Sequence, residues 1–355
     1  MNPTTAITAE SLLAELTDYL DKLSRGLDTL ARLDAPPPAG AAREAVYRRA
    51  RVTLYRYQPL HPQPRPVPLL ICYALVNRPT VLDLQPERSL IRSLLVAGLQ
   101  VYLVDWGDVG PAERGLTLAD YIQGHLRACV DYVRRRHRLD AIDLLGVCQG
   151  GTFSLCFTAL YPSRIRKLVT MVAPVDFHTP DNHLTSLTRH MDVERLVARC
   201  GGYLPGAWLN GLFLFLNPDR LLGWKYIDLV ERMVDEQALR DFLRLEQWIF
   251  DSPDLAGPAL VQFARDCFQG NALLHGRLKI GRRRVDLTRI TQPLLNIYAE
   301  RDHLVPPAAS RALAGRTASR AYRELGFRGG HVGIYVSRGA SERIASAIAR
   351  WLHGD

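Results

Sequence analysis

The sequence predicts an α/β fold with a mostly parallel central sheet and an inserted helical cap domain. From Ala45 onward, short apolar runs alternate with segments of helical periodicity, which is typical of a parallel sheet covered on both faces. Between residues 177 and 289 this alternation stops, and a segment rich in Leu, Phe and Trp follows with helical spacing. We therefore expect residues 41–176 and 290–355 to build the sheet and residues 177–289 to form the cap.

Length and composition fit a folded globular protein. The chain has 355 residues, of which 47% are hydrophobic and 23% charged, and these values exclude disordered, collagenous and fibrous chains. The net charge of +9 is compatible with nucleic acid, a membrane surface or a polyanionic small molecule as a partner. Charge alone does not choose between them.

Six leucines near the N-terminus predict a helix with one apolar seam. They are separated by alternating steps of three and four residues, the spacing of a coiled-coil seam: Leu13, Leu16, Leu20, Leu23, Leu27 and Leu30. A proline-rich linker follows at residues 35–40, so residues 1–40 form a separate N-terminal segment. The seam either packs on its own domain or joins a partner helix.

The first residues carry no basic region followed by an apolar one, so we expect no signal peptide. No apolar run approaches the roughly 18 residues that a membrane-spanning helix needs, so we also expect no transmembrane segment. The six cysteines have no CxxC pair and no regular spacing, which fits neither a disulfide framework nor a zinc ribbon. The sequence therefore favours a reducing cytoplasm.

The elements of the core can be placed along the chain from these patterns. Strands are predicted at residues 51–57, 69–75, 101–105, 142–147, 167–172, 294–298 and 322–325. Helices are predicted at residues 118–136, 152–160, 308–313 and 341–352.

A candidate nucleophile lies at the end of the fourth predicted strand. Cys148 follows that strand and precedes a helical pattern, with Gly146 and Gly150 on either side. This spacing is typical of a nucleophile on a sharp strand-to-helix turn, where larger flanking side chains would collide with the backbone. A helix N-terminus favours a thiolate and stabilises an oxyanion. The pattern predicts a nucleophilic Cys148 in an α/β-hydrolase fold, with a buried structural cysteine as the alternative.

In this architecture an acid and then a histidine follow the nucleophile along the chain. Asp302 follows the sixth predicted strand, and His331 follows the seventh behind two glycines. The carboxyl ends of parallel strands meet at the edge where open α/β sheets place their sites. We therefore expect Asp302 and His331 to complete a triad, with Glu300 and His303 as the competing carboxylate and imidazole.

The other cysteines and the arginine runs have simpler interpretations. We expect core packing for the remaining thiols: Cys72, Cys129, Cys156, Cys200 and Cys267. The arginine runs at residues 134–136 and 282–284 are interpreted as solvated faces, with phosphate binding as the less favoured reading. We expect no metal site.

Six motifs together closely resemble the polyhydroxyalkanoate synthases. They are Ala-Leu-Val-Asn-Arg-Pro (74–79), Val-Asp-Trp-Gly (104–107), Leu-Leu-Gly-Val-Cys-Gln-Gly-Gly (144–151), Phe-Asp-Ser-Pro-Asp (250–254), Asp-His-Leu-Val-Pro-Pro (302–307) and Gly-Gly-His-Val-Gly-Ile-Tyr (329–335). Class I and II synthases carry a long additional N-terminal domain that this sequence does not show. The chain therefore resembles the catalytic subunit of a class III enzyme, with class IV as the next alternative.

The resemblance implies an acyltransferase that polymerises (R)-3-hydroxyacyl-CoA, with 3-hydroxybutyryl-CoA as the expected substrate, and releases CoA. It carries the family triad onto Cys148, Asp302 and His331, with a thioester on the cysteine as the intermediate. The backbone N–H groups of Gln149 and Val76 are the expected oxyanion donors. No cofactor is expected, because the CoA thioester is itself the substrate. The residues that bind CoA are not identified, and Asp302 either orients the histidine or acts on the attacking hydroxyl.

The resemblance also implies partners and a location. Class III enzymes depend on a second helical subunit, so we expect a homo-oligomer or hetero-oligomer in contact with the growing polymer chain and the granule surface. This places the protein in the cytoplasm, at polyhydroxyalkanoate granules. We expect no nucleic acid partner, because no nucleic-acid-binding motif is present.

Two other functions compete with this interpretation. Dienelactone hydrolases also place a cysteine in a Gly-x-Cys-x-Gly turn, and such an enzyme would cleave esters or thioesters. Their interval from cysteine to aspartate is much shorter than the 154 residues between Cys148 and Asp302. The second alternative is a catalytically silent interaction protein, which the ordered triad disfavours.

Overall fold

The computed structural model describes residues 9–33, 40–216, 225–337 and 339–354. Contacts within the chain divide it into two compact units. The smaller unit comprises residues 1–38 and 210–250, and the larger unit comprises residues 39–209 and 251–355. Of the segment expected to form a cap, residues 177–289, only residues 210–250 group with the N-terminal segment.

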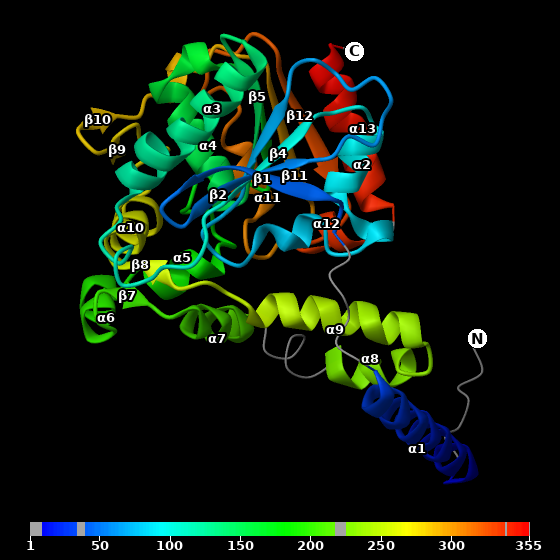
Figure 1. Ribbon diagram of the computed structural model, residues 1–355. Coiled ribbons are helices and arrows are strands. Elements are labelled where there is room, and N and C mark those ends of the chain that lie inside the picture. Colours follow the sequence, from blue (N-terminus) through cyan, green and yellow to red (C-terminus); the bar gives the residue numbers. More distant parts are fainter. Residues whose placement is uncertain (1–8, 34–39, 217–224, 338, 355) are drawn as a thin grey trace, which may run out of the picture. The chain divides into compact units, whose positions relative to one another are not determined.

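The larger unit is built on a mostly parallel sheet (Figure 1). In the described part of the chain eight strands form it in the order β1-β2-β4-β3-β5-β6-β11-β12. Strand β2 runs antiparallel to both of its neighbours, β1 and β4, and the other pairs are parallel. The strands are β1 (Arg43–Arg49), β2 (Val52–Tyr57), β3 (Leu69–Cys72), β4 (Val101–Asp105), β5 (Ile142–Val147), β6 (Ile165–Met171), β11 (Leu294–Ala299) and β12 (Tyr322–Phe327). The predicted fold class is confirmed.

Helices cover both faces of this sheet (Figure 1). On one side lie α3 (Arg127–His137) and α4 (Gln149–Leu160), and on the other lie α2 (Leu90–Val96) and α13 (Ala340–His353). The central strands β3 and β5 are buried along their whole length, as expected for parallel strands covered on both faces. The short helices α11 (Pro307–Arg311) and α12 (Gly333–Val336) follow β11 and β12.

The rest of the larger unit consists of short elements outside the main sheet. Its helical pieces are η1 (Pro79–Leu82), η2 (Pro86–Arg88), η3 (Asp120–Leu126), η4 (Pro162–Arg164), α5 (His183–Thr188), α6 (Val193–Arg199), α10 (Gly257–Phe263), η6 (Ala264–Gln269) and η7 (Leu287–Arg289). Its two short strand pairs are β7 (Tyr203–Leu204) with β8 (Leu255–Ala256), and β9 (Lys279–Ile280) with β10 (Arg283–Arg284). The division between the units falls within α7 (Gly206–Leu216).

Two strands differ from the sequence prediction for physical reasons. Strand β1 was not predicted, because it is an edge strand whose charged side chains give no apolar pattern. The predicted strand at residues 69–75 ends at Cys72, because Tyr73–Leu75 leave the sheet to form a loop. A Cβ on Gly150 would collide with the carbonyl groups of Cys72 and Tyr73, so this loop starts in direct contact with the turn that carries Cys148.

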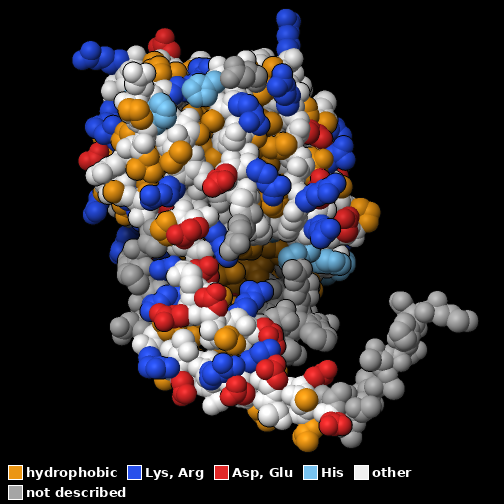
Figure 2. Space-filling view, turned by 90° about the vertical axis from the view of Figure 1, so that its right-hand side faces the viewer, with side chains coloured by type: hydrophobic (Ala, Val, Ile, Leu, Met, Phe, Trp, Pro, Cys, Tyr) orange, Lys and Arg blue, Asp and Glu red, His pale blue; other side chains and the backbone are white. Residues whose placement is uncertain are grey.

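The surface of the larger unit carries mixed charges. On the face shown in Figure 2, Lys and Arg side chains are interspersed with Asp and Glu rather than collected into one basic area. This face therefore shows no single basic area to which the net charge of +9 could be assigned. No helix in the described ranges combines the length and the apolar character needed to cross a membrane.

The smaller unit is helical and leaves five of the six seam leucines exposed, while Leu23 is half-buried. It contains α1 (Ala9–Arg32), α8 (Lys225–Arg232) and α9 (Glu236–Phe250). Helix α1 contacts α8 through an ion pair of 2.8 Å between Lys22 and Glu231, and Gly26 lies against Met233. On α1, Lys22 and Gly26 each come one residue before a leucine of the seam. At about 100° per residue, this places them roughly a third of a turn around the helix from the seam. The exposed fractions of the seam are 67% for Leu13, 51% for Leu16, 60% for Leu20, 52% for Leu27 and 38% for Leu30.

This exposure predicts that the seam contributes little to the stability of the isolated chain. Changing Leu13, Leu20 and Leu27 together to Gln keeps helix propensity similar and should shift the free energy of unfolding by less than about 1 kcal/mol, because little buried surface is lost. Met233→Ala is the control, and loss of this buried side chain should cost about 2 kcal/mol or more. Thermal unfolding followed by circular dichroism measures both, and an equal loss in the triple variant would contradict the prediction.

Candidate active site

Cys148 lies on the turn between β5 and α4, as the sequence predicts. Its backbone has a φ of 54° and a ψ of −126°, a strained conformation for a residue with a side chain. The turn is held by main-chain hydrogen bonds, in which Cys148 N–H donates to the Met171 carbonyl at 2.9 Å and Gly151 N–H donates to the Cys148 carbonyl at 2.8 Å. The side chain is partly exposed, so the thiol points out of the sheet at the N-terminus of a helix.

Three glycines around Cys148 allow the close packing that this turn requires. A Cβ built on Gly146, Gly150 or Gly151 would lie within 3.0 Å of neighbouring atoms. For Gly150 these atoms belong to the main chain of Cys72 and Tyr73, and for Gly151 the nearest is the Ala173 side chain. The first turn of α4 therefore lies directly against the end of β3, and the nucleophile is carried by packed backbone.

Asp302 and His331 lie together although 29 residues separate them. Asp302 follows β11 and His331 follows β12, which are parallel neighbours. His331 Nδ1 lies 2.7 Å from Asp302 Oδ2. The second carboxylate oxygen of Asp302 accepts hydrogen bonds from the N–H groups of Leu304 at 2.9 Å and Val305 at 2.8 Å. Both carboxylate oxygens are thus occupied, which fixes the carboxylate and, through it, the imidazole ring.

The charges around His331 favour its protonated form. Burial lowers the pKa of the imidazole, but the Asp302 carboxylate raises it, as do its hydrogen bonds to Asp302 and Cys148. The net result is a pKa well above the ordinary value for histidine. The imidazole therefore connects the nucleophile to the acid, in the order thiol, imidazole, carboxylate.

Neither of the two competing residues takes part in the hydrogen bond between His331 and Asp302. The Glu300 side chain is exposed and lies beside Gly326, so Asp302 is the carboxylate that contacts His331. His303 is adjacent to Asp302 and half-buried. Thus the structure brings together the three residues that the sequence predicts, Cys148, Asp302 and His331.

The two expected oxyanion donors belong to segments that are joined by a hydrogen bond. Gln149 is the first residue of α4, and Val76 lies in the loop after β3. The Leu75 N–H donates to the Gln149 side-chain oxygen at 3.0 Å. This bond keeps the loop of Val76 next to the first turn of α4.

A polar network around the Val76 loop was not predicted from the sequence. Arg78 forms ion pairs of 2.7 Å with Asp108 and 2.8 Å with Asp251. The Ser252 hydroxyl lies 3.1 Å from the Asn77 side-chain oxygen. Two of the six motifs, residues 74–79 and 250–254, therefore meet here, and Asp108, directly after a third, joins them; these contacts hold the loop in place. The only signal available in the sequence was that each motif contains a charged or amide side chain.

The remaining cysteines are packing residues, as predicted, except that Cys200 is half-buried rather than buried. Burial raises the pKa of Cys72, Cys129 and Cys156 to about 12, and that of Cys267 well above its usual value. These thiols stay protonated at neutral pH and are unreactive as nucleophiles.

The two arginine runs make several contacts within the protein. Arg134 donates to the Asp140 carbonyl at 2.5 Å and pairs with Asp131 at 2.9 Å. Arg283 donates to the Leu160 carbonyl at 2.8 Å, and its guanidinium lies over the Tyr161 ring. These contacts give the side chains structural roles and provide no support for phosphate binding at these positions.

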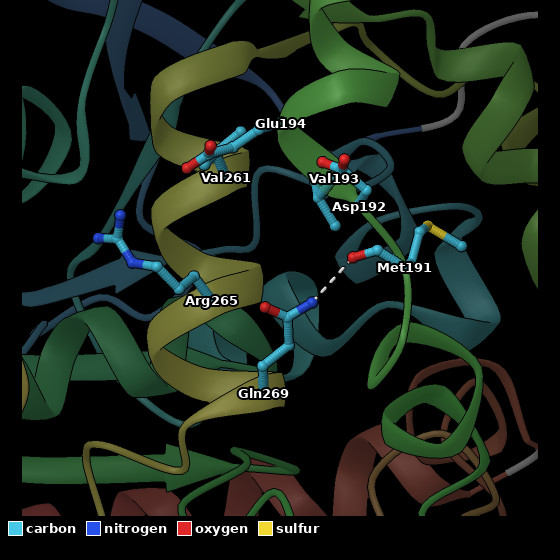
Figure 3. A pocket seen from close by; sticks show the side chains of 7 residues that line it. All are labelled: Met191, Asp192, Val193, Glu194, Val261, Arg265 and Gln269. Atoms are coloured by element: carbon cyan, nitrogen blue, oxygen red, sulfur yellow. Dashed lines mark hydrogen bonds between the residues drawn. The ribbon is translucent and has the colours of Figure 1, made fainter.

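A small cavity of about 140 Å³ lies between α6 and α10 with η6 (Figure 3). Its lining residues are Met191, Asp192, Val193, Glu194, Val261, Arg265 and Gln269. The Gln269 amide inside it donates to the main-chain carbonyl groups of Thr188 and Met191. None of the three triad residues lines this cavity. In the described ranges no cluster of three or more His, Cys, Asp or Glu side chains is arranged to hold a metal ion.

Comparison with known proteins identifies the family. Residues 67–337 match the family model for the alpha/beta hydrolase fold. Over 349 residues the chain is 48% identical to the poly(3-hydroxyalkanoate) polymerase subunit PhaC of Allochromatium vinosum, covering 98% of each chain. The chain belongs to the poly(3-hydroxyalkanoate) polymerase family. It is also 46% identical over 348 residues to the subunit of the same name from Thiocystis violacea, again covering 98% of both.

Solved structures agree on the fold. A thermophilic esterase from Thermogutta terrifontis superposes with a TM-score of 0.54 at 16% identity, covering 88% of this chain and 98% of the esterase. At this identity the likeness concerns the α/β-hydrolase fold alone. The expected membership of the polymerase family and the expected fold are both confirmed.

The close packing of the glycines around Cys148 predicts that one added methyl group strongly lowers the stability of this member of the polymerase family. Gly151→Ala places a Cβ against Ala173 and should lower the free energy of unfolding by about 1–3 kcal/mol. The control is Gly124→Ala in η3, where the nearest atom is the Ala119 carbonyl oxygen at 4.0 Å. That change should be neutral or stabilise by up to about 1 kcal/mol. Urea unfolding compares them, and equal stabilities of the two variants would contradict the prediction.

The raised pKa of His331 predicts a pH-dependent contribution to stability. A group whose pKa is raised by folding stabilises the folded state below its unfolded pKa, about 6.5 for histidine. The contribution is lost as the pH rises through the raised value. The melting temperature of the wild type should therefore exceed that of His331→Gln by the largest amount at or below about pH 6.5. This difference should shrink as the pH rises further. Scanning calorimetry at several pH values measures this difference, and a difference that grows with pH would contradict the assignment.

Proposed function

We propose that this chain polymerises (R)-3-hydroxyacyl-CoA, with 3-hydroxybutyryl-CoA as the main substrate, into polyhydroxyalkanoate and releases CoA. The observation that carries the chemistry is the buried His331, placed between the Asp302 carboxylate and the Cys148 thiol. The two relatives at 48% and 46% identity are named poly(3-hydroxyalkanoate) polymerase subunits, which supports a polymerase over other enzymes with this fold.

In the first step the Cys148 sulfur attacks the thioester carbonyl of the substrate. His331 holds the proton from the thiol and then protonates the departing CoA sulfur, so the acyl group moves from one sulfur to another. The backbone N–H groups of Gln149 and Val76 would stabilise the negative oxygen of the intermediate. The contact between Leu75 and Gln149 supports this pairing, because it keeps the two donor segments adjacent.

In the second step a hydroxyl group attacks the acyl group held on Cys148. The oxygen of that hydroxyl forms the new ester bond, His331 accepts the proton, and the Cys148 thiolate leaves. A thioester is reactive enough toward an alcohol for this exchange to need no further activation. The scheme uses no cofactor, since the CoA thioester supplies the activated acyl group.

Asp302 acts on this chemistry through His331. Its 2.7 Å contact with Nδ1 orients the ring so that Nε2 faces the nucleophile, and its charge stabilises the imidazolium that forms in each step. We propose this orienting role as the main one, because both carboxylate oxygens are already occupied by hydrogen bonds.

We further propose that the chain works with a second, helical subunit, as in class III synthases. The exposed leucine seam of α1 supports this, because its spacing of three and four residues is suited to another helix. Location in the cytoplasm at polyhydroxyalkanoate granules, in contact with the growing polymer, follows from the same function.

The assignment of the nucleophile predicts that Cys148→Ala abolishes CoA release while the protein stays folded, because Ala fits the turn but cannot form the thioester. Cys148→Ser should retain less than about a hundredth of the activity, because a serine hydroxyl stays protonated at neutral pH and is a weaker nucleophile than a thiolate. The assay follows free thiol from 3-hydroxybutyryl-CoA together with insoluble polymer.

Cys200→Ala serves as the matched control, because Cys200 is also partly exposed and has no role in the scheme. This variant should retain wild-type CoA release. Activity in Cys148→Ala near that of the wild type would overturn the proposal. Rapid CoA release by the wild type without polymer would instead indicate a thioester hydrolase.

A further inference from the structure

A buried phenol beside the triad has no hydrogen-bond partner. Tyr335 lies in α12, four residues after His331, and only 1% of its surface is exposed. Within the described residues its hydroxyl contacts no donor or acceptor. An unpaired buried hydroxyl costs about 1–3 kcal/mol, so such a group is retained in a folded protein for a reason other than stability.

Tyr335 lies next to residues that take part in the proposed reaction. The ring packs edge-on against the His331 imidazole, with centroids 6.4 Å apart and planes at 80°. Burial raises the pKa of Tyr335 well above its ordinary value, and the negative charge of the Asp302 carboxylate raises it further. The hydroxyl therefore stays protonated at any working pH, so it is available as a hydrogen-bond donor to an oxygen.

A hydroxyacyl group on Cys148 carries two oxygens that need partners. The carbonyl oxygen has the proposed backbone donors at Gln149 and Val76. The oxygen on carbon 3 has none among them, whether it is a free hydroxyl or already part of an ester. Burying that oxygen without a donor would cost free energy in the acyl-enzyme.

We infer that the Tyr335 hydroxyl donates a hydrogen bond to the 3-oxygen of the acyl group held on Cys148. This inference rests on the proposed function. The same contact makes Tyr335 a specificity residue, because an acyl group without a 3-oxygen leaves the phenol unpaired in the complex. Less than 1 Å² of the hydroxyl oxygen is exposed, so neighbouring side chains must shift when the acyl group enters.

The first test is stability, which separates this role from simple packing. Tyr335→Phe removes only the unpaired hydroxyl and should leave the melting temperature unchanged or raise it. The matched control is Tyr102→Phe. Tyr102 lies in the first half of β4, and its hydroxyl lies 2.8 Å from His137 Nε2. That variant should melt at a lower temperature, because it loses a hydrogen bond. A lower melting temperature for Tyr335→Phe would mean that its hydroxyl has a structural partner, and would overturn the inference.

The second test compares two thioesters, 3-hydroxybutyryl-CoA and butyryl-CoA, in single-turnover release of CoA. With 3-hydroxybutyryl-CoA, Tyr335→Phe should lower the ratio of the acylation rate constant to the substrate dissociation constant by about tenfold or more. This loss corresponds to a hydrogen bond of roughly 1.4 kcal/mol. With butyryl-CoA the variant should match the wild type. Tyr102→Phe should match the wild type with both.

Each other outcome has a definite meaning. An unchanged rate with both thioesters overturns the inference and leaves the proposed function intact. An equal loss with both places the Tyr335 hydroxyl on the carbonyl oxygen and also overturns the assignment to the 3-oxygen. A wild type that releases no CoA from 3-hydroxybutyryl-CoA overturns the proposed function, and the inference with it.

Discussion

The close approach of α4 to the ends of β3 and β5 is the constraint on which the active site depends. Gly146, Gly150 and Gly151 permit this approach, because a single methyl group on any of them would meet neighbouring atoms. The approach forces Cys148 into a positive φ and presents its thiol at the start of a helix. It also sets where the chain leaves β3, and with it the loop of Val76. One packing contact thus fixes the positions of Cys148 and of the Val76 loop together.

The charges around His331 are a second constraint on the site, in addition to the backbone packing. The acid and the imidazole are both buried, and water screens their interaction little. His331 lies between Asp302 and Cys148, and its pKa is raised, while the two phenols nearby, Tyr73 and Tyr335, remain neutral because burial raises their pKa. The raised pKa values keep both phenols protonated beside His331 at neutral pH.

Much of this could be predicted from the sequence, because the core strands and the triad each carry a local signal. Cys148 has its glycines, and Asp302 and His331 each follow an apolar strand. Strand β1 has no such signal, since an exposed edge strand needs no apolar face. The contact of Arg78 with Asp251 and the unpaired hydroxyl of Tyr335 depend on how distant segments pack. Spacing along the chain carries no information about such contacts.

The short strands β7 and β8 give the chain a modular character. Tyr203 pairs with Ala256 and Leu204 with Leu255, so the polypeptide leaves this region and returns to it at adjacent points. A further bond between the Gly206 N–H and Asp254, at 2.9 Å, closes the same junction. Because the cost of closing a loop grows only slowly with its length, a segment joined at such a junction can be lengthened, shortened or replaced over evolution. All eight strands of the main sheet lie outside residues 205–254, so a change in the length of that segment leaves the strand order intact.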